Sequence, residues 1–214
     1  MKQTILSSTY FGPVQWYCKL NTYDNILIET CDNYIKQTYR NRCYIASPNG
    51  IQALSIPVER PDETPLTKTK MKDIQISSHG NWRHIHWNAL VSAYGESPFF
   101  EYYADDIRPF FEKEWKYLLD YNMEICEKMC ELLDIHPNIE KTNDFITDVT
   151  GMDDFRDAIN PKHPAEDDDF EARVYYQVYR ERYGFQPNLS ILDLLCNMGP
   201  EGIFWLKAKN AEKK

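Results

Sequence analysis

The chain has 214 residues, a formal net charge of −9, 43% hydrophobic residues and 27% charged residues. This balance excludes an intrinsically disordered chain, and the negative charge excludes binding of nucleic acid or an anionic membrane through the overall charge. The length predicts one domain over residues 1–214, large enough to bury its own core without disulfides or metals.

The cysteines and the N-terminal residues indicate the compartment. The apolar stretch after Lys2 is too short for a signal peptide, and no segment is long enough to cross a bilayer. We therefore expect a cytoplasmic protein without a membrane span. No C-x-x-C pair occurs, so we expect buried free thiols of a reducing compartment at Cys18, Cys31, Cys43, Cys126, Cys130 and Cys196.

The first third of the chain has the pattern of a βαβ unit. Apolar runs at residues 4–6 and 26–28 predict two strands, and residues 14–21 between them have helical spacing. A hairpin is predicted over residues 43–58, because Asn49-Gly50 supplies the positive φ that a tight turn needs.

The rest of the chain is mostly helical in pattern. Residues 59–72 predict an exposed loop, and residues 73–76 predict one more short strand. Helical periodicity then covers residues 82–94 and 105–133, with a break expected near residues 120–122.

The C-terminal third alternates polar and helical segments. The acidic run 166–169 predicts a solvated loop within a polar region, and residues 170–183 predict a helix that ends at Gly184. A last helix is predicted over residues 187–195, ended by Gly199.

These elements predict an α/β fold. A strand-rich portion with a hairpin occupies about residues 1–78, a mostly helical portion follows at about residues 79–206, and residues 207–214 form a polar tail.

The segment 77–87 is the first candidate site, because it holds three of the five histidines and two of the five tryptophans. A strand that leads through a loop into a helix leaves free N–H groups that favour an anion. Arg83 in the first turn could bind a phosphate or carboxylate, and Ser78, His79 or Asn81 could cap the helix. His79 is the residue predicted as acid or base, because histidine titrates near neutral pH.

Helical spacing places Trp82 with His86 on one face and Arg83 with Trp87 on another. The tryptophans could stack on a ligand ring, or they could belong to the core while the histidines only stabilise the helix start. A zinc site is not predicted, because His84 and His86 point about 200° apart on a helix.

The second candidate is a basic stretch in an acidic protein, residues 36–42. In an extended chain Lys36, Arg40 and Arg42 would lie on one side and could bind phosphates or carboxylates together with Asn41. The alternative is an exposed edge strand that its charges protect from aggregation.

Two loops complete the candidate residues. Tyr10 lies in the loop after the first strand, where α/β proteins bind ligands, although neither standard phosphate-binding glycine motif is present. Asn188 and Ser190 lie where the last helix opens, and Asp193 could face the site; plain helix capping is the alternative for this segment.

In these motifs the chain resembles the WbqC-like family of bacterial proteins, especially the form common in Bacteroidetes. The resemblance covers nearly the whole chain and rests on Lys36 to Arg42, Pro48-Asn49-Gly50, Leu54 to Val58, His79 to His84, Ala93-Tyr94, Ser97 to Phe100, Asn188-Leu189-Ser190 and Met198-Gly199-Pro200. One departure is in the first loop, which keeps Tyr10 but lacks the Gln-Pro of many relatives.

The resemblance implies a role in surface polysaccharide synthesis, because some members are encoded among O-antigen genes. We therefore expect a transferase that acts on a nucleotide-activated sugar or an acyl donor. In this hypothesis His79 and Arg83 are catalytic, and the substrate-binding residues are Tyr10, Lys36, Arg40, Asn41, Arg42, Asn81, Trp82, His84, Asn188 and Ser190.

A non-catalytic binding or scaffold protein is the alternative, with exposed tyrosines and Pro98-Phe99-Phe100 as its partner surface. A small anion or sugar nucleotide is the expected ligand in both cases. An oligomer is compatible with the sequence, and no residue pattern names a cofactor.

Overall fold

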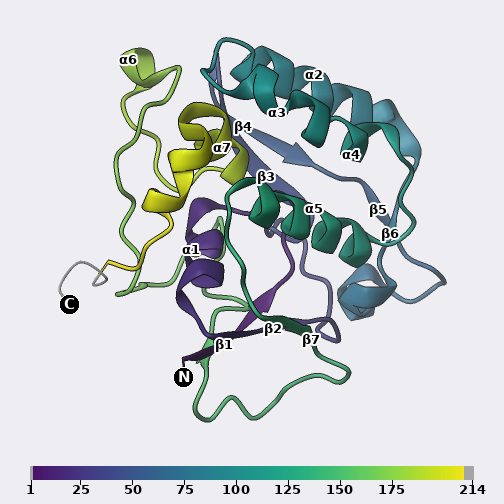
Figure 1. Ribbon diagram of the computed structural model, residues 1–214. Helices are drawn as coiled ribbons and strands as arrows, with labels where there is room; N and C mark the ends of the chain where they lie inside the picture. The colour runs from purple at the N-terminus through teal and green to yellow at the C-terminus, as the bar shows by residue number, and fades with distance from the viewer. Residues whose placement is uncertain (1, 210–214) are drawn as a thin grey trace.

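The computed structural model describes residues 2–209. Strand β1 (Gln3–Ser7), helix α1 (Val14–Thr22) and strand β2 (Asn25–Glu29) form the predicted βαβ unit (Figure 1). Strands β1 and β2 are parallel, with Gln3 opposite Asn25 and Ser7 opposite Glu29. The parallel pair brings the carboxyl ends of both strands to the same edge.

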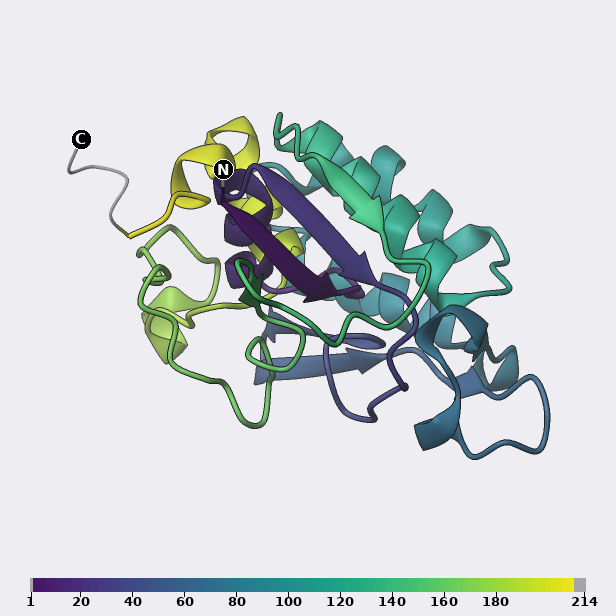
Figure 2. The ribbon, with the colours of Figure 1, turned by 90° about the horizontal axis from the view of Figure 1, so that it is seen from below.

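Two short strands that the sequence did not predict extend this sheet. Strand β7 (Ile139–Lys141) pairs with β2, and strand β8 (Asp153–Asp154) pairs with β1, both in parallel. The sheet order is therefore β7-β2-β1-β8, and Figure 2 shows these strands from below. Neither segment has an apolar run, so their extended form comes from pairing with a neighbouring strand and not from local preference.

The hairpin is confirmed. Strands β3 (Arg42–Ser47) and β4 (Gly50–Ser55) are antiparallel, and Gly50 has the positive φ of 100° that the turn requires. Strand β5 (Val58–Glu59) pairs with β6 (Gln75–Ile76) in a second antiparallel ribbon. The predicted loop between them contains two short 3-10 turns, η1 (Leu66–Lys68) and η2 (Met71–Asp73).

The helical part begins as predicted but breaks at another point. The turn η3 (His79–Asn81) leads into helix α2 (Trp82–Tyr94), which has the expected bounds. The next helices are α3 (Phe100–Ile107), α4 (Pro109–Glu112) and α5 (Leu118–Leu132).

The expected break at residues 120–122 is wrong, because Tyr121 and Asn122 lie buried inside α5. The chain leaves the helical form at residues 113–117. There the Ile76 N–H donates to the Lys116 carbonyl, and the Leu118 N–H donates to the Ile74 carbonyl. Pairing with the β6 segment therefore decides where the helix stops.

The helix predicted over residues 170–183 is wrong for most of its length. Only α6 (Arg180–Tyr183) is helical, and Gly184 ends it with φ 71°. The preceding chain is held against α7 (Ile191–Met198), because the Tyr175 hydroxyl and the Gln177 amide both donate to Asp193 Oδ2, at 2.7 and 2.8 Å.

The acidic run 166–169 is also not wholly solvated. The Asp167 side chain is buried and accepts a hydrogen bond of 2.7 Å from Lys19 Nζ, which is itself buried. Lys19 Nζ also lies 4.3 Å from the centre of the Phe155 ring. Pairing with Lys19 therefore draws one carboxylate of the run out of water.

The fold is a mixed α/β arrangement, with strands mainly in the first part and helices mainly in the second. In Figure 1 the parallel sheet lies at the bottom, α2, α3 and α4 lie at the top, and α5 and α7 lie between them. The 3-10 segment η4 (Gly199–Trp205) follows α7. All six cysteines are buried and free, as predicted. Within residues 2–209, no helix has the length and apolar character that a membrane crossing needs.

A buried polar pair joins the first loop to α2. The Tyr10 hydroxyl lies 2.9 Å from His86 Nδ1, and both side chains are buried. Burial lowers the pKa of His86 from 6.5 to about 4, with a backbone hydrogen bond to Ser55 acting in the opposite direction. The imidazole is therefore neutral, and its Nδ1 shares a hydrogen bond with the Tyr10 hydroxyl.

This neutral histidine should make folding sensitive to acid. The unfolded chain binds the proton near pH 6.5, and the folded chain binds it only near pH 4. The contribution of His86 to stability is therefore complete above pH 6.5 and falls by about 3 kcal/mol as the pH drops to 4. In His86→Gln this loss should be absent, so the free energies of unfolding in urea of wild type and variant should converge between pH 7.5 and pH 4.5. Exposed His163→Gln is the control, and parallel pH profiles of wild type and His86→Gln would contradict the assignment.

Candidate functional site

The residues predicted around the start of α2 enclose a cavity of about 340 Å³, here called the α2 pocket. Its lining comes from the start of α2 and from the α3–α4 region. The lining residues are Ser78, Asn81, Trp82, Arg83, His84, Trp87, Arg108, Phe111, Glu112 and Glu114.

Two arginines and two glutamates, Arg83, Arg108, Glu112 and Glu114, line the α2 pocket, so its charges sum to 2 − 2 = 0. The Arg83 guanidinium lies 4.8 Å from the Trp82 ring centre, and its Nε is buried without a hydrogen-bond partner. Arg108 Nε donates to Glu112 at 2.6 Å. Asn81 precedes the helix with φ 37° and provides no side-chain cap, so the first N–H groups of α2 remain uncapped. Arg83 and the start of α2 therefore suit an anionic group, whereas the Arg108 charge is already paired with Glu112.

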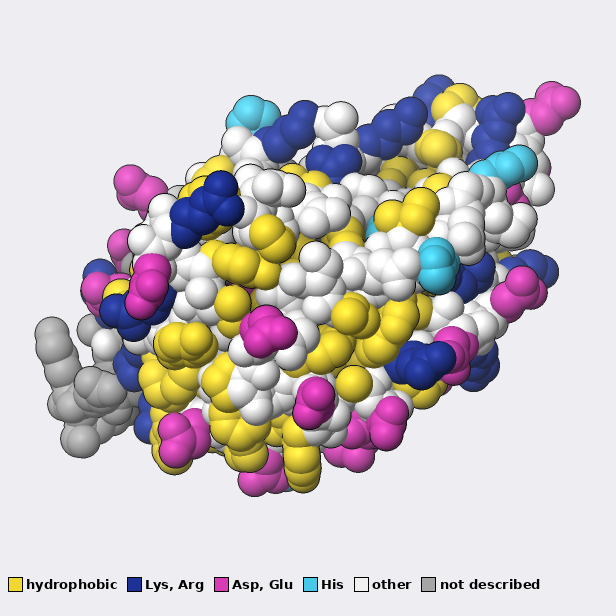
Figure 3. Space-filling model, turned by 90° about the horizontal axis from the view of Figure 1, so that it is seen from above, with side chains coloured by type: hydrophobic (Ala, Val, Ile, Leu, Met, Phe, Trp, Pro, Cys, Tyr) yellow, Lys and Arg dark blue, Asp and Glu magenta, His cyan; other side chains and the backbone are white. Residues whose placement is uncertain are grey.

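Aromatic rings provide the apolar wall of the same pocket. Trp87 packs against Phe111 with ring centres 5.9 Å apart. Trp82 and His86 are buried, as their shared face of α2 predicts, and Trp82 also lines the pocket beside Arg83 and Trp87. In Figure 3, basic side chains gather along one edge of the face that carries α2 and α3, whereas hydrophobic and acidic side chains share the opposite edge.

The two exposed histidines of the segment differ in position. His79 is outside the pocket lining, and its N–H donates to Ser77 Oγ at 3.3 Å. His84 lines the pocket, and the Asn88 amide nitrogen lies 2.9 Å from its Nε2. The imidazole that lines the cavity is therefore that of His84, which contacts the Asn88 side chain, and not that of His79.

A second cavity of about 310 Å³, the sheet-edge pocket, lies where the strands of the parallel sheet end. This is the edge at which α/β proteins bind ligands. Its lining residues are Cys31, Asp32, Asn33, Ile35, Arg40, Phe145, Asp154, Arg156 and Asp157.

Arg40 is the central side chain of the sheet-edge pocket and is only 3% exposed. Its Nη2 donates to Ser7 Oγ at 2.7 Å and to Asp32 Oδ2 at 2.5 Å, and lies 3.9 Å from Asp157 Oδ1. Burial raises the pKa of Asp32, and the adjacent Arg40 charge opposes that rise. A buried ion pair thus joins the ends of β1 and β2.

A second buried pair lies beside the first. Glu29 is fully buried, and its Oε2 accepts from the Ile146 N–H and from Arg156 Nη1. Arg156 also holds both carboxylate oxygens of Asp154, which raises the pKa of Arg156.

The charges at this edge do not favour a phosphate. Two guanidinium groups face four carboxylates, those of Glu29, Asp32, Asp154 and Asp157, so the local sum is 2 − 4 = −2. No local sequence pattern indicates this cluster, because its members lie far apart along the chain, in β2, in β8 and in loops. Within residues 2–209, no group of three or more His, Cys, Asp and Glu side chains could hold a metal ion.

The basic stretch 36–42 does not form the expected row. The chain turns at residues 36–40, with φ 63° at Gln37, so alternate side chains do not share a side. Lys36 is exposed and Arg40 is buried, while Arg42 Nε donates to Ser55 Oγ at 2.7 Å. Asn41 Nδ2 donates to the Ile56 carbonyl.

Asn188 and Ser190 act as helix caps in this structure. Asn188 Oδ1 accepts from the Gln15 N–H at the start of α1, and Ser190 Oγ accepts from the Leu192 N–H at the start of α7. Asp193 is fully buried and lines neither pocket; burial raises its pKa to about 6. Tyr10 is likewise in the core, against His86.

Comparison with known proteins gives one family. The sequence model described as the WbqC-like protein family matches residues 8–204. An uncharacterized protein of Mycobacterium tuberculosis, Rv1507c, is 23% identical over 231 residues, which cover 97% of this chain and 98% of that protein. No solved structure matches the chain significantly.

Removing the buried guanidinium should affect stability directly. Arg40→Ala leaves the Asp32 charge buried without its partner, so the free energy of unfolding should fall by about 3–5 kcal/mol. Lys36→Ala removes an exposed charge of the same stretch and should change it by less than about 0.5 kcal/mol. Urea denaturation measures both, and equal effects of the two variants would show that the Arg40 pair is not stabilising.

Proposed function

The chain belongs to the WbqC-like protein family, and on that premise we propose that it is a cytoplasmic transferase of surface-polysaccharide sugar modification. Its donor substrate is a nucleotide-activated sugar or an acyl donor. The observation that carries this proposal is the α2 pocket, where Arg83, Arg108 and the uncapped start of α2 surround an aromatic wall. The link to polysaccharides rests on the family alone.

The charges of the α2 pocket cancel, whereas those of the sheet-edge pocket sum to −2, so the α2 pocket is the better donor site of the two. Nucleotide sugars and acyl carriers such as coenzyme A carry phosphates, which a guanidinium binds through two parallel hydrogen bonds. Arg83 is already oriented by the Trp82 ring, so little side-chain freedom is lost when it binds an anion. Trp87 and Phe111 offer rings for a base or sugar to pack against.

His84 is the residue that we assign as general base. The acceptor hydroxyl or amine forms a bond to the transferred carbon, the bond to the leaving phosphate or thiolate breaks, and His84 takes the acceptor proton. Arg83 and Arg108 would stabilise the charge on the leaving group. His79, the histidine favoured by sequence, lies outside the pocket lining.

The alternative of a non-catalytic binding protein loses one part of its predicted partner surface, although Tyr102 and Tyr176 are exposed as it expects. Phe100 is 6% exposed, and the Phe99 ring packs closely against Gly199. Both aromatic side chains therefore contribute to packing and do not form an exposed patch. We favour the transferase for this reason.

Ligand binding can be tested before the reaction is known. UDP-sugars, other nucleotide sugars or acyl-CoA should raise the melting temperature, by the equivalent of about 2.7 kcal/mol at 100 times Kd. Arg83→Gln should abolish the shift, whereas Arg60→Gln, which removes an exposed arginine, should retain it. Thermal-shift measurements of the three proteins decide this. No shift with any class, or equal shifts in both variants, would contradict the donor site.

The two histidines can be separated by activity. With the donor found in that screen, His84→Ala should lower kcat by about 10²-fold or more, because it removes the base. His79→Ala should leave kcat unchanged, and both variants should fold, because both side chains are exposed. Product formation measured by mass spectrometry gives the answer, and loss of activity in His79→Ala alone would return the base to the position that the sequence favoured.

A further inference from the structure

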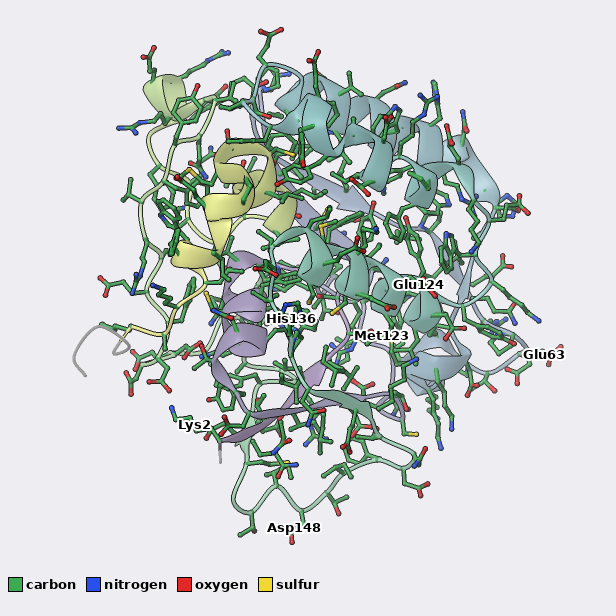
Figure 4. All side chains as sticks on the ribbon, in the orientation of Figure 1. Lys2, Glu63, Met123, Glu124, His136 and Asp148 are labelled. Atoms are coloured by element: carbon green, nitrogen blue, oxygen red, sulfur yellow. The ribbon has the colours of Figure 1, made fainter. Side chains whose placement is uncertain are left out.

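A cavity of about 760 Å³ forms a groove between α5 and β7 and shares no lining residue with either pocket. We call it the α5 groove. Figure 4 labels Met123 and Glu124 on α5 and His136 on the segment that leads to β7. The lining residues are Asp120, Met123, Glu124, Cys126, Glu127, Cys130, Glu131, Ile135, His136, Pro137, Ile139 and Lys141.

The helix side of the groove has two adjacent stripes of different character. Met123, Cys126 and Cys130 form an apolar stripe, and Ile135 and Ile139 continue it toward the strand. At about 100° per residue, the second stripe stays within about 60° of arc along the helix. It consists of the carboxylates Asp120, Glu124, Glu127 and Glu131.

Most of these carboxylates have no cationic partner. Glu131 pairs with Lys128 at 2.7 Å, but within residues 2–209 no Lys or Arg forms an ion pair with Asp120, Glu124 or Glu127. Three unpaired carboxylates beside an apolar surface favour an occupant that combines positive charge with an aliphatic stem. Lysine and arginine side chains have that construction.

The strand side of the groove is the open edge of the sheet. Strand β7 is last in the order β7-β2-β1-β8. The Ile26 N–H donates to the Asn138 carbonyl and the Thr142 N–H donates to the Ile28 carbonyl, so the even-numbered residues face β2. The peptide groups of Ile139 and Lys141 therefore point outward and can pair with a further strand.

The dimensions of the two sides agree with a short strand. From Asp120 to Glu131 the helix advances about 16 Å, at about 1.5 Å per residue. An extended chain covers that distance with about five residues, at about 3.3 Å each. Alternate side chains of such a strand face α5. Their aliphatic stems can lie on its apolar stripe while their charged ends reach its carboxylate stripe.

We propose that the α5 groove binds a basic, extended segment of a partner polypeptide as an additional strand on β7. Main-chain hydrogen bonds to Ile139 and Lys141 hold the segment. Its alternate Lys or Arg stems lie on the apolar stripe, and their charged ends reach Glu124 and Glu127.

The probe is a fluorescein-labelled pentapeptide, Lys-Val-Lys-Val-Lys, titrated with the intact protein and followed by fluorescence anisotropy. It should bind with saturation, whereas Glu-Val-Glu-Val-Glu should bind at least tenfold more weakly. Methylation of alternate backbone nitrogens of the basic peptide should abolish binding in one of the two possible registers, because it removes the N–H groups that pair with β7.

Two variants test the two halves of the proposal. Glu124→Lys combined with Glu127→Lys should weaken binding of the basic peptide at least tenfold. Glu63→Lys combined with Asp148→Lys changes the net charge equally at positions away from the groove (Figure 4) and should not weaken it to the same degree. Lys141→Pro removes one outward N–H and also a positive charge, so weaker binding in this variant reports the lost hydrogen bond and not the charge.

Equal affinity of the basic peptide for wild type and for the Glu124/Glu127 variant would overturn the proposal, as would absence of binding up to millimolar protein. Unchanged affinity in Lys141→Pro together with retained binding of both methylated peptides would overturn the added strand. Circular dichroism of each variant shows that the fold is intact, and hydrogen exchange at Ile139 and Lys141 gives a second measurement: the peptide should slow exchange of these two amides.

Discussion

The burial of Arg40 is the constraint on which most of the architecture depends. A guanidinium group withdrawn from water needs hydrogen-bond acceptors, and Ser7 at the end of β1 and Asp32 after β2 both accept from its Nη2. The Arg40 carbonyl in turn accepts from Asn122 of α5. One residue thereby joins the parallel sheet, the start of the hairpin and the central helix.

Charge is distributed unevenly over this framework, and the three cavities differ in consequence. The sheet-edge pocket pairs its arginines internally, and its excess carboxylates disfavour phosphate. The α2 pocket combines two arginines with a helix start, and the α5 groove faces a stripe of carboxylates. An acidic chain can therefore bind an anion at one place and a basic segment at another, because solvent screens charges that lie more than about 10 Å apart.

The buried titratable groups show a related balance. Burial lowers the pKa of His86 to about 4 and raises the pKa of Asp193 to about 6, so both are neutral over part of the acidic range. As the pH rises, the His86 contribution gains stability below pH 6.5 while the Asp193 contribution loses it. In the whole protein these two changes of stability with pH oppose each other. Each can be measured alone only when the other group is removed by substitution.

The sequence by itself determined the elements that local patterns specify. The β1–α1–β2 unit, the Asn49-Gly50 turn, the bounds of α2 and the shared face of Trp82 and His86 all follow from apolar spacing and turn chemistry. Such patterns involve residues within a few positions of one another, so they can be read from the sequence before the fold is known. About half of the α2 pocket could be named in this way, because Asn81, Trp82, Arg83 and His84 are consecutive.

Only the tertiary structure decided what depends on distant partners. Strands β7 and β8 exist because β2 and β1 offer them hydrogen bonds, and residues 113–117 leave the helical form to pair beside β6. Arg108 joins Arg83, and Asp32 and Asp157 join Arg40, from positions far along the chain. Whether a cation is exposed like Lys36 or buried like Arg40 is decided by which acceptors the folded chain brings to it, and no local pattern contains that information.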